Sequence, residues 1–248
     1  MAFGTILSSP KTGAVLTALA LAATPPAWAD DRKAAAPQRT VLFSSADAGS
    51  SGFLTVGAKR TLAGSLDESG PVALASIGAG GSPERMGLPG LGDAAFRPAV
   101  QASALAGYQW ALGRTFLSLF AGPELDRDRF PSPGGPAREA TRVGARVHGE
   151  IWMHPTDETL VNGTAIAGTA RGHLWTRASA GYKVWRDVFV GPEASLYRTE
   201  DYREWRVGAH ATGVQLGRFT FRLSTGWRRD ESSPKGGPYG GLSVHVKM

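Results

Sequence analysis

The residues of this chain that could do chemistry are arginines, glutamates and histidines that alternate with apolar side chains. In one clear example, Arg142, Arg146, His148 and Glu150 fall on one side of a two-residue repeat, and Val143, Ala145, Val147 and Ile151 fall on the other. Such a repeat predicts a β-strand with one polar and one apolar face. The candidates for polar faces along the chain are Glu124, Arg142, Arg146, His148, Glu150, Arg177, Lys183, Glu193, Arg206, His210 and Arg222.

No pattern in the sequence favours a metal site, a cofactor or a cysteine nucleophile. The chain has no cysteine, which excludes disulfides and thiolate ligands. The histidines His148, His173, His210 and His245 lack a second histidine two residues away, so a metal site is not expected. His154 falls in a predicted turn, where a solvated side chain is expected. The formal net charge of +6 is spread without a basic tract, so nucleic acid is not an expected partner.

The strands that position these residues are clearest in the last part of the chain. In the run from Phe219 to Trp227, Phe, Phe, Leu, Thr and Trp share one face and Thr, Arg, Ser and Gly share the other. The two-residue turn at Gly217-Arg218 joins this run to the one before it. A third alternating run ends on Met248, the last residue. Long amphipathic strands of this kind are typical of a transmembrane β-barrel, with lipid outside and a polar lumen.

The N-terminal segment predicts export. Lys11 precedes an apolar stretch at 13–23, and Ala27-Trp-Ala29 follows it. This order predicts a signal peptide over 1–29, followed by a flexible lead-in at 30–40. The apolar stretch is too short to cross a bilayer, which takes about 20 residues in a helix. The remaining chain is therefore expected to be either a barrel or a periplasmic β-sandwich, and the features below favour the barrel.

The pattern of connections also favours an outer-membrane barrel. Joins at 112–114, 154–158, 186–187 and 217 are tight, whereas those at 81–97, 127–139 and 230–237 are long and rich in Gly or Pro. Short turns on one rim and long loops on the other are typical of this class. We predict an all-β, antiparallel up-and-down barrel over 41–248 in the cell outer membrane. Its expected strands, about twelve in number, cover 41–48, 52–62, 71–80, 98–111, 115–126, 140–153, 159–170, 173–185, 188–200, 203–216, 218–229 and 238–247.

Tryptophans near strand ends give a second indication. Such rings mark the two interfaces of a membrane. The predicted aromatic girdle comprises Trp110, Trp152, Trp175, Trp185, Trp205 and Trp227. Trp152 and Trp175 alternate onto polar faces, so the girdle is imperfect. Pro123 and Pro192 lie inside predicted strands and are expected to mark bulges.

Three motifs in order resemble the cellulose biosynthesis protein BcsS family. They are Glu150-Ile-Trp-Met-His-Pro-Thr-Asp157, Gly191-Pro-Glu193 and the run from Tyr202 to Gly213. The resemblance covers roughly 41–248 and implies an outer-membrane barrel associated with bacterial cellulose synthesis. The partners it implies are outer-membrane lipids, the barrel-assembly machinery, β-glucan chains and other cellulose secretion proteins. It supplies no catalytic residues to carry over.

The sequence leaves several functions open. The first is a non-enzymatic, porin-like barrel that supports secretion or surface anchoring of cellulose. The second is a lipid-acting barrel hydrolase, although Asn162 has no His-x-Ser motif nearby and His210 has no serine at suitable spacing. The third is a plugged barrel that acts as a scaffold for secretion proteins. Inward charges fit both a lumen filled by Arg–Glu pairs and an open passage for a glucan.

Overall fold

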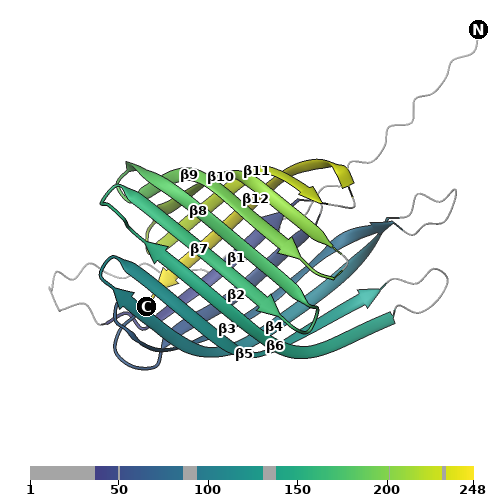
Figure 1. Ribbon diagram of the computed structural model, residues 1–248, viewed down its shortest axis with the longest axis horizontal. Helices are drawn as coiled ribbons and strands as arrows, with labels where there is room; N and C mark the ends of the chain where they lie inside the picture. The colour runs from purple at the N-terminus through teal and green to yellow at the C-terminus, as the bar shows by residue number, and fades with distance from the viewer. Residues whose placement is uncertain (1–36, 50, 86–93, 131–137, 201, 231–232) are drawn as a thin grey trace, which may run out of the picture. The chain divides into compact units, whose positions relative to one another are not determined.

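The computed structural model describes residues 37–49, 51–85, 94–130, 138–200, 202–230 and 233–248 (Figure 1). The predicted signal peptide 1–29 and most of the lead-in lie outside these residues. The described chain forms one closed antiparallel barrel in which each strand pairs with its sequence neighbours. This confirms the predicted up-and-down topology with twelve strands. The strands are β1 (Thr40–Ala48), β2 (Gly52–Thr61), β3 (Gly70–Arg85), β4 (Ala94–Leu112), β5 (Thr115–Phe130), β6 (Arg138–Met153), β7 (Thr159–Gly168), β8 (His173–Trp185), β9 (Val188–Arg198), β10 (Arg203–Leu216), β11 (Phe219–Asp230) and β12 (Ser233–Lys247).

The barrel closes between its first and last strands. β1 pairs with β12 from Val41 opposite Lys247 to Ala48 opposite Gly240. The backbone N–H groups of Arg39 and Thr40 both donate to the Met248 carbonyl, at 2.7 and 2.8 Å. Closure matters because an open sheet edge would leave unpaired peptide groups in lipid.

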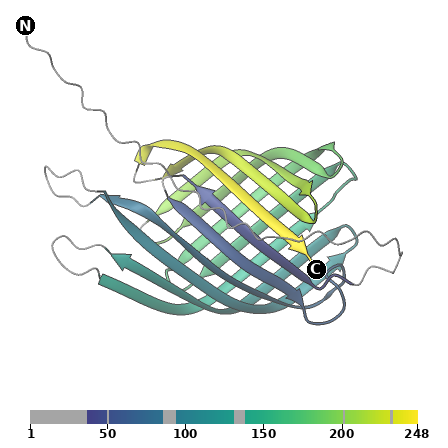
Figure 2. The ribbon, with the colours of Figure 1, turned by 180° about the vertical axis from the view of Figure 1, so that it is seen from behind.

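The two rims differ as the sequence predicts. On the short-turn rim, Gly113 and Gly217 adopt positive φ angles of 62° and 60°, which glycine tolerates without strain. On the long-loop rim, β3–β4 and β5–β6 form hairpins that reach beyond their neighbours (Figures 1 and 2). The predicted loops at 81–97 and 127–139 are therefore too long, because residues at both ends of each belong to β-strands. Their Gly and Pro content suggested loops, but the strand pairing continues as far as Arg85 opposite Ala94 and Phe130 opposite Arg138. Both termini of the barrel lie at the short-turn rim, which is the periplasmic side in barrels of this class.

The prediction of β-bulges at Pro123 and Pro192 is wrong. Pro123 pairs in register with Ala145, and Pro192 with Ala209. A proline removes one ladder hydrogen bond but adds no residue to the strand, so the register continues across it. The register shifts lie elsewhere, between Lys183 and Trp185, between Thr212 and Val214, and between Arg228 and Asp230.

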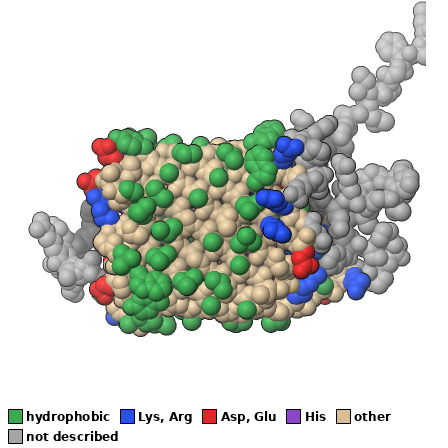
Figure 3. Space-filling model, in the orientation of Figure 1, with side chains coloured by type: hydrophobic (Ala, Val, Ile, Leu, Met, Phe, Trp, Pro, Cys, Tyr) green, Lys and Arg blue, Asp and Glu red, His purple; other side chains and the backbone are tan. Residues whose placement is uncertain are grey.

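The outer wall is an apolar band. Figure 3 shows hydrophobic side chains distributed over this face, with charged side chains near its two ends. The exposed residues include Leu54, Ile77, Leu119, Val147 and Val207, each about half exposed. This is the surface that a barrel presents to lipid. No helix in the described part of the chain has the length and apolar character needed to cross a membrane.

The interior is not uniformly polar, which corrects the expectation of a polar lumen along every strand. Val72, Leu74, Leu105 and Phe120 form a buried cluster on the inner faces of β3, β4 and β5, with Phe43 packed against it. The β2–β3 connection at 62–69 contributes the buried Leu66. Gln109 fixes this connection, because its side-chain amide donates to the carbonyls of Leu66 and Glu68 at 2.7 and 3.3 Å. Apolar side chains therefore occupy part of the barrel interior on the side of β3, β4 and β5.

Candidate functional site

The lumen contains a cavity of about 2130 Å³ that both polar and apolar side chains line. Its lining includes Arg114 and Asp157 at the short-turn rim and Arg171 and Tyr202 at the long-loop rim. Because the lining includes side chains from both rims, the cavity extends along the barrel from one rim to the other among the described residues. We take this cavity as the candidate functional site.

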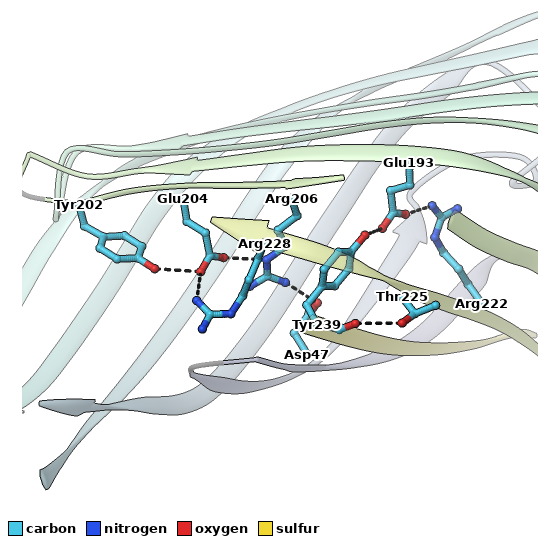
Figure 4. Close-up of polar contacts among 9 residues, drawn as sticks. All are labelled: Asp47, Glu193, Tyr202, Glu204, Arg206, Arg222, Thr225, Arg228 and Tyr239. Carbon is cyan, nitrogen blue, oxygen red and sulfur yellow. Dashed lines mark hydrogen bonds and ion pairs between the residues drawn. The ribbon is translucent and has the colours of Figure 1, made fainter. Parts of the chain in front are cut away.

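One wall of the cavity carries a chain of polar contacts near the long-loop rim (Figure 4). The Tyr202 hydroxyl donates to the Glu204 carboxylate at 2.9 Å. Glu204 also accepts from Arg206 Nε at 2.7 Å and from Arg228 Nη1 at 3.1 Å. Arg228 donates in addition to Asp230 at 3.1 Å. The inward positions of β10 and β11 thus form a network of alternating charge.

The chain continues toward the middle of the barrel. Arg206 reaches across to Asp47 on β1 at 3.2 Å and lies 5.4 Å from the ring centroid of Tyr239 on β12. The Tyr239 hydroxyl donates to Glu193 at 3.4 Å. Glu193 also accepts from Arg222. Figure 4 shows these side chains between Tyr202 and Arg222, so the contacts join strands β1, β9, β10, β11 and β12.

Arg222 is the most enclosed cation of this chain of contacts. Its Nη1 donates to Thr212 Oγ1 at 2.7 Å, and its Nη2 donates to Ser179 Oγ at 3.1 Å. The exposed fractions of the Arg222 and Glu193 side chains are 7% and 4%. Burying two charges is favourable only when hydrogen bonds satisfy both partners, and these hydroxyls contribute to that.

A second group of charges lies on the opposite wall. Asp128 is fully buried and pairs with Arg97, Arg142 and Arg171 at 3.3, 3.0 and 3.2 Å. Arg171 also lies 3.8 Å from Asp126. Because Arg171 belongs to the β7–β8 turn, this group ties a connection at the long-loop rim to the β4–β6 wall.

Two further carboxylates lie deeper in the lumen. Glu124 accepts from the Ala170 backbone N–H at 2.9 Å and lies 3.9 Å from His173. Glu150 pairs with Lys59 at 3.1 Å and with His148 at 3.2 Å. Lys59 also donates to the Ser118 hydroxyl at 2.9 Å. Both carboxylates thus pair with groups on other strands.

The structure places the predicted polar residues on the inner faces of their strands. Of these, Arg142, Arg146, His148, Glu150, Arg177, Lys183, Glu193 and Arg206 line the cavity, whereas Glu124, His210 and Arg222 are buried beside it. They do not form one network. Glu150 belongs to the Lys59 group, Arg206 belongs to the Glu204 group, and Arg146 donates to Gln101 at 3.2 Å.

Sequence reasoning missed several partners, namely Asp47, Lys59, Asp126, Asp128, Arg171, Glu204 and Arg228. Asp126 and Asp128 continue the inward alternation of Glu124, and Glu204 and Arg228 continue that of Arg206 and Arg222. Extending the alternation to the strand ends would have found these four. Asp47 and Lys59 lie on the weakly patterned first strands, and Arg171 lies in a turn.

The six tryptophans of the predicted girdle divide into two groups. Trp110, Trp185, Trp205 and Trp227 are exposed near strand ends, with fractions from 36% to 63%. Trp152 and Trp175 line the cavity instead, as their alternation onto polar faces indicates. Only the first group can meet lipid headgroups.

The histidines are all directed inward. His148, His154, His173 and His245 line the cavity, and buried His210 contacts the Thr212 hydroxyl at 2.8 Å. Because all of these histidines face inward, a histidine-dependent hydrolase site on the lipid-facing wall would have no histidine to use. In the β6–β7 turn, burial and the positive charges of Arg114 and Lys183 lower the pKa of His154. Among the described residues, no cluster of three or more His, Asp or Glu side chains is arranged to hold a metal ion.

Comparison with known proteins gives one family and a shared fold. The family model of the cellulose biosynthesis protein BcsS matches residues 41–248, and no curated protein matches the sequence. The translocator domain of the autotransporter NalP from Neisseria meningitidis is similar, with 14% identity and a TM-score of 0.52 over 86% of this chain and 89% of that chain. The transport unit of the autotransporter AIDA-I from Escherichia coli is similar, with 10% identity and a TM-score of 0.52 over 88% and 91%. The KdgM porin has 8% identity and a TM-score of 0.48 over 84% and 99%. The family match and the barrel fold place the chain in the bacterial outer membrane.

Proposed function

Because the chain belongs to the cellulose biosynthesis protein BcsS family and forms an outer-membrane barrel, we propose that it supports the secretion or surface anchoring of bacterial cellulose. In this proposal the barrel is not an enzyme. A β-glucan chain enters or crosses the lumen, and other cellulose secretion proteins deliver it at the periplasmic rim.

The observation that carries the proposal is the cavity with lining residues from both rims. A passage for a polymer must be continuous, and it must offer polar groups to the hydroxyls of a sugar. A barrel of this size lies between side-chain-filled small barrels and open porins, so a passage beside a partly filled interior is physically reasonable.

The charge of the lining is consistent with a neutral polymer. Basic and acidic residues are equally numerous among the described residues that line the cavity, so the lining has no excess of positive or negative charge. A cleft of one sign would concentrate ions of the opposite sign. The basic residues are Lys59, Arg97, Arg114, Arg142, Arg146, Arg171, Arg177, Lys183, Arg206, Arg228 and Lys247, and the acidic residues are Asp47, Asp67, Asp126, Asp128, Glu150, Asp157, Asp187, Glu193, Glu200, Glu204 and Asp230.

Blocking the lumen is expected to abolish the role in secretion. Ser45 on β1 and Thr164 on β7 line the cavity from opposite walls, since five strands lie between β1 and β7 in either direction around the barrel. A deletion strain complemented with the Ser45→Trp/Thr164→Trp protein is expected to release about tenfold less extracellular cellulose than one complemented with wild type. The measurement is glucose liberated from washed extracellular material by cellulase.

The matched control is Ala46→Trp/Ala165→Trp, which changes the next residue on each strand. These side chains alternate onto the lipid-facing side, so the control is expected to restore cellulose release. Both variants must reach the outer membrane in equal amounts and show heat-modifiable migration on gels. Full release with the folded, lumen-blocked variant would contradict passage through the barrel and favour a scaffold role.

A further inference from the structure

The part of the lumen near the long-loop rim contains three aromatic rings on adjacent elements. Trp175 on β8 pairs in register with Tyr197 on β9. Tyr202, in the β9–β10 connection, packs against Tyr197 with ring centroids 6.1 Å apart. All three residues line the cavity. They therefore give a contiguous aromatic surface on one wall of the passage.

A guanidinium with unused donors lies beside these rings. Arg177 follows Trp175 by two residues on the same face of β8, and its guanidinium carbon lies 5.3 Å from the Trp175 ring centroid. Within the described part of the chain, Arg177 makes no side-chain hydrogen bond or ion pair, and its Nε is buried without a partner. In contrast, Arg206 and Arg228 are both held by carboxylates. An arginine carries five N–H donors and no acceptor, so Arg177 offers hydrogen-bonding capacity toward the cavity.

Aromatic rings beside free donors have the chemistry that recognises carbohydrate. An apolar ring face packs against the C–H face of a pyranose, while a few placed polar groups bind its hydroxyls and fix its orientation. The guanidinium of Arg222 lies within electrostatic reach of Arg177, and so do the carboxylates of Glu193, Asp47 and Glu150. Together these carboxylates balance the two guanidiniums, so the site carries no excess of positive charge and favours a neutral sugar over a carboxylated one.

We infer that Trp175, Arg177 and Tyr197 form a binding subsite for a glucosyl unit of a neutral β-glucan near the extracellular mouth. The inference rests on the proposed function, because the lumen must admit the polymer for the subsite to act. The subsite holds a short stretch of the chain where it leaves the barrel. It is a binding site only and involves no covalent step.

The test is block of ion current by cellohexaose in planar bilayers that contain the refolded mature protein. For wild type, cellohexaose is expected to reduce the conductance in a concentration-dependent way. Trp175→Ala and Tyr197→Ala are each expected to raise the half-blocking concentration about tenfold, as truncation of a central aromatic contact commonly does. Trp175→Phe is expected to lie between wild type and Trp175→Ala, because it retains a smaller ring.

The matched control is Trp205→Ala, which removes an outward-facing tryptophan near the same rim that does not line the cavity. It is expected to leave the half-blocking concentration within about twofold of wild type, since that ring lies outside the subsite. If Trp175→Ala does not refold, Tyr197→Ala and Trp175→Phe still decide the question.

The pattern of results distinguishes failure of the subsite alone from failure of the proposed passage. Unchanged block in the Trp175 and Tyr197 variants, with block in wild type, would overturn the subsite and leave the passage intact. Tighter block of wild type by hexagalacturonate than by cellohexaose would overturn the choice of a neutral ligand. Conducting wild-type channels that cellohexaose does not block would overturn the subsite and the proposed passage together.

Discussion

Replacing Glu193 with Gln is expected to destabilise the barrel by about 3–5 kcal/mol, the usual cost of removing one partner of a buried ion pair. The change leaves Arg222 charged and enclosed without a carboxylate, so the Thr212 and Ser179 hydroxyls and at most one amide oxygen remain as its acceptors. Arg222 and the Tyr239 hydroxyl use different oxygens of Glu193, and an amide has an acceptor oxygen at only one of these two positions. The free energy of unfolding would be measured by urea titration of the protein in lipid vesicles, with gel mobility reporting the folded fraction.

The control for this change is Glu139→Gln. Glu139 pairs with Arg127 at 2.5 Å, but their side chains are 46% and 55% exposed, so its loss is expected to leave the free energy of unfolding nearly unchanged. The double change Glu193→Gln/Arg222→Gln is expected to recover part of the lost stability, because no unpaired charge remains. Equal stability of the Glu193→Gln and Glu139→Gln proteins would show that Arg222 does not depend on Glu193.

Replacing Val147 with Arg is expected to destabilise the folded barrel by about 2–4 kcal/mol and so to impair its assembly. This is the cost of a lipid-facing arginine near the bilayer midplane. Val147 lies near the middle of β6 and is 48% exposed on the outer wall. The neighbours Arg146 and His148 on the same strand face inward, so the substitution places a charge in lipid rather than in the lumen. The measurement is the fraction of heat-modifiable protein recovered in outer membranes, together with urea unfolding in vesicles.

A change on the same strand and face provides the comparison. Thr141→Arg lies near the long-loop end of β6, where an outward arginine is expected to cost about 0–1 kcal/mol. If Val147→Arg assembles like wild type while Arg146→Leu blocks insertion, the faces of β6 are reversed and the lumen assignment is wrong.

The barrel could be predicted from the sequence because its main signal is local. Alternation on β10, β11 and β12 gives the strand faces directly, and each tight turn fixes how two neighbours pair. The same local signal fails on β3 and β4, where the runs 73–75 (Ala-Leu-Ala) and 104–106 (Ala-Leu-Ala) are apolar on both faces. The buried cluster around Leu74 and Leu105 is therefore visible only after the strands are closed into a barrel.

The pairing of charges inside the lumen could not be predicted for a different reason. Alternation shows which side chains face inward, but partners such as Arg206 and Asp47 lie on strands far apart in the sequence and meet only across the closed barrel. Arg171 reaches Asp128 from a turn, where no repeat indicates its direction. The free donors of Arg177 likewise became evident only once the partners of the other arginines were known.

Single-channel conductance of the refolded wild-type protein in a planar bilayer tests the central claim most directly, namely that a continuous passage runs through the barrel. We expect discrete conductance steps with weak selectivity between cations and anions, because the lining carries charges of both signs. We also expect cellohexaose to reduce these steps. A protein that is folded by heat-modifiable mobility but shows no conductance would contradict an open lumen, and would instead support a plugged barrel that serves as a scaffold.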